Sequence, residues 1–175
     1  MNVIAAQGLV LEPQVADHAA EMFAVLSDPA IYEYEMEPPV SVEALRSRYE
    51  RLESRRSPDG REHWLNWAIR LPAGELAGFV QATVQPDGNA GIAYVFASAF
   101  WGRGIASRAV RAMIGELARG YGVTGLSAVL KKRNARSLRL LERLGFERAS
   151  PERAAASGLE PDEMLYVVRI GKVLS

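Results

Sequence analysis

The chain of 175 residues contains no cysteine and only two histidines, His18 and His63. The absence of cysteine excludes disulfide bonds, thiolate metal sites and a cysteine nucleophile, and it is typical of a reducing compartment. We therefore expect a cytoplasmic protein without a metal cofactor. Basic and acidic residues number 21 each, so the formal net charge is zero and no broad positive field favours nucleic acid. Long apolar runs are also missing, so no membrane partner is expected.

What is present is the composition of an ordinary folded protein, with 49% hydrophobic and 24% charged residues. The length suits a single domain over residues 1–175. Apolar spacing predicts an α/β (α+β) chain in the order β-α-α-β-β-β-α-β-α-β-β. The expected strands are 8–12, 64–69, 75–85, 90–97, 124–130, 146–149 and 162–170, and the expected helices are 15–26, 41–55, 103–119 and 134–144. Residues 150–161 are predicted to form a mobile loop.

The strand 90–97 is apolar on both faces, which predicts a central place in the sheet. It leads into Trp101-Gly102-Arg103-Gly104-Ile105-Ala106 and then into an amphipathic helix. A glycine turn at a helix N-terminus exposes backbone N–H groups at the positive end of the helix dipole, and Arg103 and Ser107 add a cation and a hydroxyl. The pattern indicates a phosphate site. By itself it also fits a glycine turn that merely lets a strand enter a helix tightly.

Two other phosphate motifs are absent. The chain has no GxxxxGK[ST] string, and Ser107 stands where a dinucleotide fingerprint needs its third glycine. An acidic residue is also missing about 20 positions further on, in the stretch 125–130. Neither ATP nor NAD is favoured, although an NAD-binding enzyme remains a third hypothesis that fits only the short glycine string.

A second motif lies downstream, where Asn134-Ala135-Arg136-Ser137 is followed by Leu140 to Phe146 with the sequence LLERLGF. Together the two motifs resemble the GNAT acetyltransferase superfamily, and Phe100 to Ala106 is most similar to the branch that acetylates the N-termini of ribosomal proteins. The resemblance implies a mixed, mostly antiparallel sheet of about seven strands, with splayed central strands and helices on both faces. It also implies acetyl-CoA as cosubstrate.

The resemblance further implies which residues contact acetyl-CoA. Its pyrophosphate would lie on the amides of residues 102–107, and its pantetheine arm would pair with residues 94–96 like an added strand. A backbone N–H near Val95 or Phe96 would polarise the thioester carbonyl. The cofactor-binding residues expected in this way are Tyr94, Val95, Phe96, Trp101, Gly102, Arg103, Gly104, Ile105, Ala106, Ser107, Asn134 and Ser137.

By the same resemblance, Asn134 and Ser137 face the cofactor arm near its sulfur, and Ser137 is the candidate acid for the leaving thiol. Asn134 and Ser137 also suit the start of a helix, so each residue fits a capping role as well. Many members of the superfamily carry a tyrosine acid where this chain has Leu141. That departure keeps a second hypothesis open, a non-catalytic acyl-CoA-binding or protein-interaction module on the same fold.

With no cysteine and two histidines, a direct attack of an amine on the thioester is favoured over an acyl-enzyme. An α-amino group loses its proton more readily than a lysine, which favours a protein N-terminus or a small-molecule amine as acceptor. No base is identified. The acidic loop that contains Glu33, Tyr34, Glu35 and Glu37 is predicted to line the acceptor side or to be a solvated surface.

Three aromatic residues, Trp64, Trp67 and Tyr94, are predicted either to shape the acceptor pocket or to belong to the core. His63 is interpreted as structural. The sequence does not fix the oligomeric state, and the resemblance is compatible with a homodimer.

Overall fold

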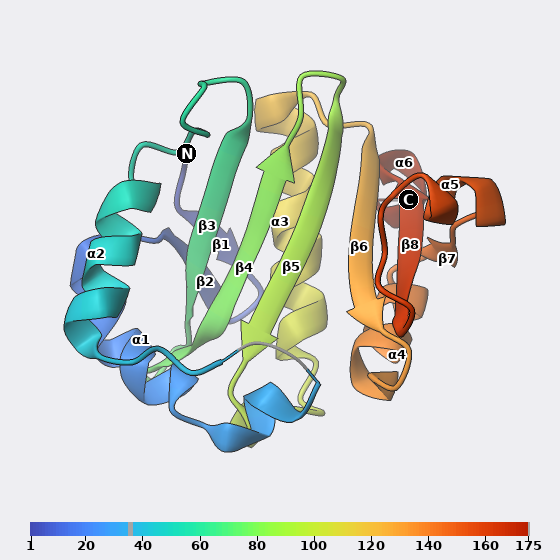
Figure 1. The fold of residues 1–175 in the computed structure, drawn as a ribbon. Helices are drawn as coiled ribbons and strands as arrows, with labels where there is room; N and C mark the ends of the chain where they lie inside the picture. The colour runs from blue at the N-terminus through green and yellow to red at the C-terminus, as the bar shows by residue number, and fades with distance from the viewer. Residues whose placement is uncertain (35–36, 175) are drawn as a thin grey trace.

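The computed structural model describes residues 1–34 and 37–174, and its centre is one eight-stranded sheet (Figure 1). The strands are β1 (Ile4–Ala6), β2 (Leu9–Pro13), β3 (His63–Arg70), β4 (Leu76–Val84), β5 (Asn89–Phe96), β6 (Gly125–Lys131), β7 (Glu147–Arg148) and β8 (Glu163–Arg169). Their order across the sheet is β1-β2-β3-β4-β5-β6-β8-β7. All neighbours are antiparallel except β5 and β6, which run parallel.

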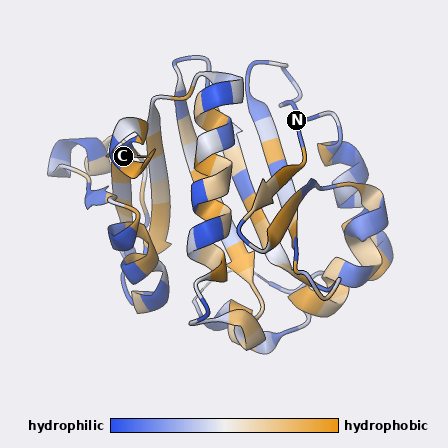
Figure 2. Ribbon diagram, turned by 180° about the vertical axis from the view of Figure 1, so that it is seen from behind, coloured by the Kyte–Doolittle hydropathy of each residue, from blue (hydrophilic) through white to orange (hydrophobic). Residues whose placement is uncertain are grey.

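Helices cover both faces of this sheet. The α-helices are α1 (Ala19–Leu26), α2 (Val42–Leu52), α3 (Ile105–Tyr121), α4 (Ala135–Arg143), α5 (Pro151–Ala155) and α6 (Ile170–Leu174), and the short 3₁₀ helices are η1 (Ala16–His18), η2 (Pro29–Glu33) and η3 (Ser98–Phe100). Helices α1 and α2 lie on the face nearer the viewer in Figure 1, and α3 crosses the opposite face, seen directly in Figure 2. The predicted mixed sheet with helices on both faces is therefore confirmed.

Two hydrophobic clusters follow from the alternation of side chains along β3 and β5. In β3, Leu65, Trp67 and Ile69 belong to the cluster that includes the buried side of α3, whereas Ala68 on the other face belongs to the cluster that includes α1 and α2. Strand β5 alternates in the same way, with Ile92 facing α3. Each central strand thus presents one set of side chains to each helical layer. We call the two sides of the sheet the α3 face and the α1/α2 face.

All seven predicted strands and four long helices are present, and the structure adds short elements that the sequence analysis missed. Strand β1 forms a hairpin with β2 around Gly8, whose φ of +75° suits glycine. Helix α5 lies inside the segment that was predicted to be a loop, so that prediction is wrong for Pro151–Ala155. Its start was readable, because Ser150 accepts a hydrogen bond from the Arg153 N–H and Pro151 occupies the first helical turn.

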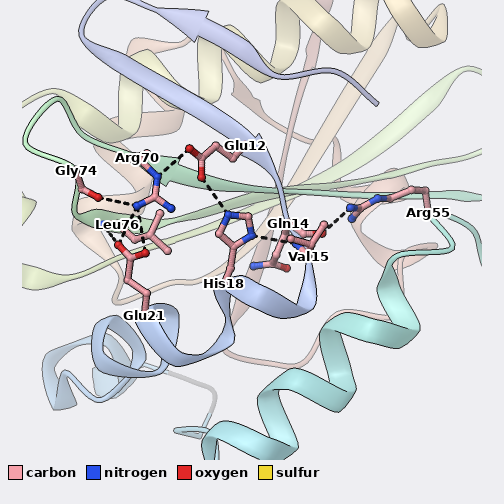
Figure 3. Close-up of polar contacts among 9 residues, drawn as sticks. All are labelled: Glu12, Gln14, Val15, His18, Glu21, Arg55, Arg70, Gly74 and Leu76. Carbon is pink, nitrogen blue, oxygen red and sulfur yellow. Dashed lines mark hydrogen bonds and ion pairs between the residues drawn. The ribbon is translucent and has the colours of Figure 1, made fainter.

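A polar network fixes η1 and α1 against the sheet (Figure 3). Arg70 on β3 donates from Nε to Glu12 on β2 at 2.8 Å and from Nη1 to Glu21 on α1 at 3.0 Å. His18 accepts the Val15 N–H at Nδ1, 3.0 Å away, so its Nε2 carries the proton shared with Glu12. These bonds fix η1 and α1 on the α1/α2 face of the sheet.

Candidate active site

The sheet is split between β5 and β6. Their parallel pairing covers only three residue pairs, from Asn89 with Gly125 to Gly91 with Ser127. Beyond Gly91, β5 continues along β4 as far as Phe96, while β6 continues along β8 as far as Lys131. The two strands visibly diverge toward α4 in Figure 1. The predicted splayed central strands are therefore present, and β5 is central as expected.

The backbone of β5 directs alternate residues into this gap. The Gln85 N–H donates to the Asn89 carbonyl at 2.9 Å, and at the other end of β5 the Ala97 N–H donates to the Ala77 carbonyl at 3.0 Å. The register between β4 and β5 is unbroken, so odd-numbered residues of β5 exchange hydrogen bonds with β4. Even-numbered residues point the other way, as the Thr124 N–H bond to the Gly88 carbonyl shows.

Because of this alternation, Val95 and Phe96, the two residues whose N–H groups were expected near the thioester carbonyl, point in opposite directions. The N–H of Val95 is directed at β4, whereas the N–H groups of Tyr94 and Phe96 face the gap. The Phe96 carbonyl accepts a hydrogen bond from the Trp101 indole at 2.9 Å. The backbone polar groups of β5 that face the gap therefore belong to Tyr94 and Phe96. The Val95 N–H bonds to β4 instead, so it does not point to where a thioester carbonyl in the gap would lie.

The glycine turn at the end of β5 has the conformation that its sequence indicates. Gly102 and Gly104 have φ values of +76° and +72°, and a Cβ atom on either would meet nothing within 4 Å. Gly104 is the N-cap of α3 and has no capping side chain, so the first N–H groups of this helix point into open space. Arg103 is exposed beside the turn, and Ser107 is half-buried in the first turn of α3. The turn fits an anionic phosphate.

The second motif meets β5 across the gap. Asn134 caps α4, because its Oδ1 accepts the Ser137 N–H at 3.0 Å, so the capping role is confirmed. The Ser137 hydroxyl lies 2.6 Å from the Tyr94 hydroxyl, a contact between residues 43 positions apart in the sequence. Burial raises the pKa of Tyr94 to about 12, and the hydrogen bond with Ser137 opposes that rise only in part.

Leu141 is fully buried in the core on the α3 face. The position at which the resemblance led us to expect a tyrosine acid in many members is therefore a packing position in this chain. The hydroxyl groups near the gap come instead from Tyr94 on β5 and Ser137 on α4. The sequence analysis assigned Tyr94 to the cofactor but did not pair it with Ser137, since nothing in the sequence brings these two residues together.

The α3 face of the gap is bridged by the contact between Tyr94 and Ser137, whereas the α1/α2 face is open. Ala93 on β5 is exposed, and Val129 on β6 is 48% exposed although it is a large apolar residue in a central strand. Leu126, Ala128 and Leu130 face α3, so Val129 lies on the same face as Ala93. An acceptor would reach the gap from this open side.

The segment after α1 is tied to both motifs. Glu33 forms an ion pair with Arg136 at 2.5 Å, and Arg136 stacks over the Trp101 ring at 3.9 Å and lies 5.6 Å from the Tyr34 ring. The hydrogen bond from Arg136 holds the pKa of Glu33 below its ordinary value, which makes Glu33 a weaker base. Glu35 lies outside the described residues.

Asp28 makes a second connection between this segment and the glycine turn. Its Oδ2 accepts the Ser98 N–H at 2.7 Å, and its Oδ1 accepts the Ala30 N–H at 3.0 Å. Hydrogen bonds from Ser98 lower the pKa of Asp28. The carboxylate therefore joins the start of η2 to the turn that precedes α3.

The remaining aromatic candidates lie apart from the gap. Trp67 is fully buried on the α3 face, and its indole donates to the Asn2 carbonyl at 3.0 Å, so it belongs to the core. Trp64 is on the α1/α2 face, but its indole donates to Glu62 at 2.9 Å. His63 contacts the Tyr121 ring edge-on at 5.3 Å, in agreement with a structural role.

The structure also shows a cavity that the sequence analysis did not find. It has a volume of about 60 Å³ and lies between α1, α2 and the sheet, where Asn66, Phe79 and Gln81 form the floor and Tyr49 forms part of the roof. A larger open depression of about 460 Å³ lies near Ser57 and Gln85, at the opposite end of β5 from the glycine turn. No residue of either motif lines the larger depression.

A mixed sheet that opens beside a parallel strand pair, with a glycine turn at the mouth of the gap, is the architecture of an acetyltransferase fold. The comparison with protein families agrees. The model described as the acetyltransferase (GNAT) domain matches residues 8–147, and the chain belongs to this family. A search of the curated proteins found no match.

Solved structures that resemble the chain cover almost all of it. A ribosomal-protein-S5-alanine acetyltransferase from Vibrio fischeri is 16% identical with a TM-score of 0.79, and the match covers 99% of both chains. RimL, a ribosomal L7/L12 α-N-protein acetyltransferase in complex with coenzyme A, is 19% identical with a TM-score of 0.80 and coverage of 98% and 99%. Mycobacterium smegmatis RimJ in complex with CoA-disulfide is 22% identical with a TM-score of 0.79 and coverage of 99% and 88%. At these identities the likeness establishes the fold alone.

No helix in the part of the chain that the structure describes is long and apolar enough to cross a membrane.

Proposed function

We propose that the protein is an acetyl-CoA-dependent N-acetyltransferase that moves the acetyl group to a primary amine, at a protein N-terminus or on a small molecule. One observation carries the proposal. The free edge of β5 beyond Gly91 leads directly into a glycine turn at the N-terminus of α3. An extended molecule with amides at one end and a diphosphate at the other matches both features, and coenzyme A is such a molecule.

In this proposal the chain binds the cosubstrate mainly through its backbone. The N–H groups of residues 102–107 donate hydrogen bonds to the pyrophosphate, and the exposed Arg103 adds positive charge. The pantetheine arm enters from the turn, so it meets Phe96 first. The N–H of Tyr94 lies two residues deeper, roughly 6.6 Å along the strand. We assign Phe96 to the arm and the Tyr94 N–H to the thioester oxygen, a contact typically worth about 3 kcal/mol in the transition state.

The leaving thiolate is stabilised by the hydroxyl pair. A coenzyme thiol has a pKa near that of cysteine, about 8.5, whereas Tyr94 has a pKa of about 12. Full proton transfer from Tyr94 would therefore be uphill by roughly 3.5 pKa units, or about 5 kcal/mol. A hydrogen bond to the sulfur costs less free energy than transfer of the Tyr94 proton. Ser137, held by its contact with Tyr94, donates to the sulfur without giving up its proton.

The amine attacks from the open α1/α2 face, over Ala93 and Val129. Its nitrogen forms the new C–N bond as the C–S bond breaks, and the proton of the amine leaves to solvent through this open side. An α-amino group, with a pKa of about 8, is neutral more often at pH 7 than a lysine side chain at about 10.4. Two structural neighbours are named as ribosomal-protein acetyltransferases, and the name of one of them specifies an α-N-protein acetyltransferase, which supports a peptide N-terminus as the acceptor.

Two measurements test the proposal. Isothermal titration with acetyl-CoA is expected to show binding, and release of free thiol is expected when a panel of peptides and small amines is added. No binding at millimolar acetyl-CoA would refute the proposal. Binding without thiol release from any amine would favour the second candidate, a non-catalytic acyl-CoA-binding or interaction module, for which the buried Leu141 is the supporting observation.

A further inference from the structure

The cavity beneath α1 and α2 contains a buried polar group without a partner. Tyr49 is 3% exposed, and its hydroxyl makes no hydrogen bond to any residue that the structure describes. A buried hydroxyl in this state is unfavourable, and such groups in folded proteins are normally paired with protein, water or ligand. The Tyr49 side chain lines the cavity, so a molecule in the cavity is placed to supply the missing bond.

Apart from Tyr49, the lining combines apolar side chains with three uncharged amides, and its two charged residues are exposed. The carboxamide side chains of Gln14, Asn66 and Gln81 line the cavity, and each can both donate and accept hydrogen bonds. The charged residues of the lining, Glu37 and Arg48, are exposed and of opposite sign. An ionised group would lose its hydration in the interior without gaining a counter-charge. The interior therefore favours a neutral group that can form hydrogen bonds.

The cavity is small and close to the gap. Its volume of about 60 Å³ is less than half of the ~150 Å³ that holds a benzene ring in an apolar cavity. Gln81 on its floor is the direct partner of Ala93 in the ladder between β4 and β5. One strand spacing, about 4.8 Å, therefore separates the backbone of Gln81, at the edge of the cavity, from that of the exposed Ala93, over which the acceptor amine is placed. Three covalent bonds of about 1.5 Å reach at most about 4.5 Å, and a hydrogen bond of about 2.9 Å at their end covers the remainder.

We propose that this cavity receives the group next to the acceptor amine and selects a small, uncharged hydrogen-bonding group, such as the hydroxymethyl side chain of an N-terminal serine. The Tyr49 hydroxyl and the carboxamide of Asn66 are its partners. The assignment depends on the function proposed above, because that function places the amine at the gap. It adds a substrate class, namely amines that carry a hydroxyl or a carboxamide two or three bonds away.

The test compares two peptides that differ by one oxygen, Ser-Gly-Gly amide and Ala-Gly-Gly amide. Calorimetry measures their binding to the protein loaded with coenzyme A, which requires no turnover, and thiol release measures kcat/KM. The serine peptide is expected to bind about tenfold more tightly, the scale of one recovered hydrogen bond. In Tyr49→Phe the two peptides are expected to bind within twofold of each other, with alanine binding unchanged. Tyr166→Phe, a buried tyrosine of β8 outside the cavity, is the matched control and should keep the preference.

Each outcome decides the matter. Equal binding of the two peptides to the wild-type protein, or a preference that survives Tyr49→Phe, overturns the inference, and so does a lack of binding by either peptide. Peptide binding with the expected preference but no thiol release overturns the proposed catalysis and leaves the pocket standing. Tyr49→Phe is expected to fold normally, because it removes a hydroxyl that lacks a partner among the described residues.

Discussion

Gly78 lies on β4 opposite Phe96, at the end of β5 that leads into the glycine turn. The pairing of β3 with β4 shifts between Ile69 and Arg70, and Gly78 has a φ of +151°, a conformation that other residues rarely adopt. A Cβ atom at this position would lie 2.0 Å from the Val95 carbonyl oxygen and 2.8 Å from the Phe96 Cα, and both of these are backbone atoms. Replacement of Gly78 by alanine must therefore displace β5 or distort β4.

The cost of Gly78→Ala can be worked from two contributions. Backbone strain at such a φ costs about 1–3 kcal/mol, and overpacking of a filled interior costs about 1–3 kcal/mol more. Their sum of about 2–6 kcal/mol is a large part of the roughly 5–15 kcal/mol that stabilises an ordinary domain. Gly74→Ala is the control, because Gly74 also has a positive φ, +99°, but a Cβ atom there meets nothing within 4 Å. It should show the strain without the overpacking.

Urea unfolding of the two variants and the wild-type protein measures the difference. Gly78→Ala is expected to lose at least 1 kcal/mol more unfolding free energy than Gly74→Ala, and its affinity for acetyl-CoA should fall because Phe96 moves with β5. If the two variants agree within about 0.5 kcal/mol, the usual scatter of surface substitutions, the close approach of β4 and β5 at Gly78 is refuted.

Three further predictions follow from the site. Tyr94→Phe is expected to lower kcat about tenfold in a thiol-release assay, the effect of one lost hydrogen bond, with the Kd for acetyl-CoA within twofold of wild type; a Kd that changes as much as kcat would contradict the role given to the hydroxyl pair. Gly104→Val is expected to weaken acetyl-CoA binding more than tenfold by calorimetry, whereas Gly158→Val, at a similar positive φ of +64° on a distant loop, should leave it unchanged; equal affinities would argue against phosphate binding at the turn. Because the pKa of Asp28 is lowered in the folded protein, its contribution to stability is present above the unfolded value of about 3.9 and is lost as the pH falls through the folded pKa. Asp28→Asn should therefore flatten the pH dependence of thermal unfolding between about pH 5 and pH 2, and an unchanged profile would show that the bond to Ser98 contributes nothing.

Local patterns in the sequence were sufficient to predict the long elements and the glycine turn. The apolar spacing of Ile105 to Leu117 predicted the buried side of α3, and Gly102 and Gly104 predicted positive φ values, because in each case neighbouring residues alone determine the outcome. Asn134 was predicted to cap α4 for the same reason. Strand β1 was missed because three residues are too few to show alternation.

Features that depend on distant residues could not be predicted in this way. Alternation in β3 separates Trp67 from Trp64 but does not say which of the two faces borders the acceptor side. The contact between Tyr94 and Ser137 depends on how far β5 and β6 diverge. The cavity at Tyr49 is formed by two helices, two strands, the segment between the helices and Gln14 after β2. The sequence could not show whether the N–H of Val95 or that of its neighbours faces the gap, because only the ladder bonds at both ends of β5 reveal which amides do so. In the structure the Val95 N–H is directed at β4.

The short parallel ladder between β5 and β6 has a consequence for how this sheet holds together. Three residue pairs join its first five strands to its last three, so the two parts are coupled weakly there in the absence of a ligand. A cosubstrate lying along Tyr94 and Phe96 would contact both parts of the sheet and so couple them more strongly. At a concentration of 100 times its Kd it would add about 2.7 kcal/mol to the stability, and amide hydrogens on both sides of the seam should then exchange more slowly with solvent.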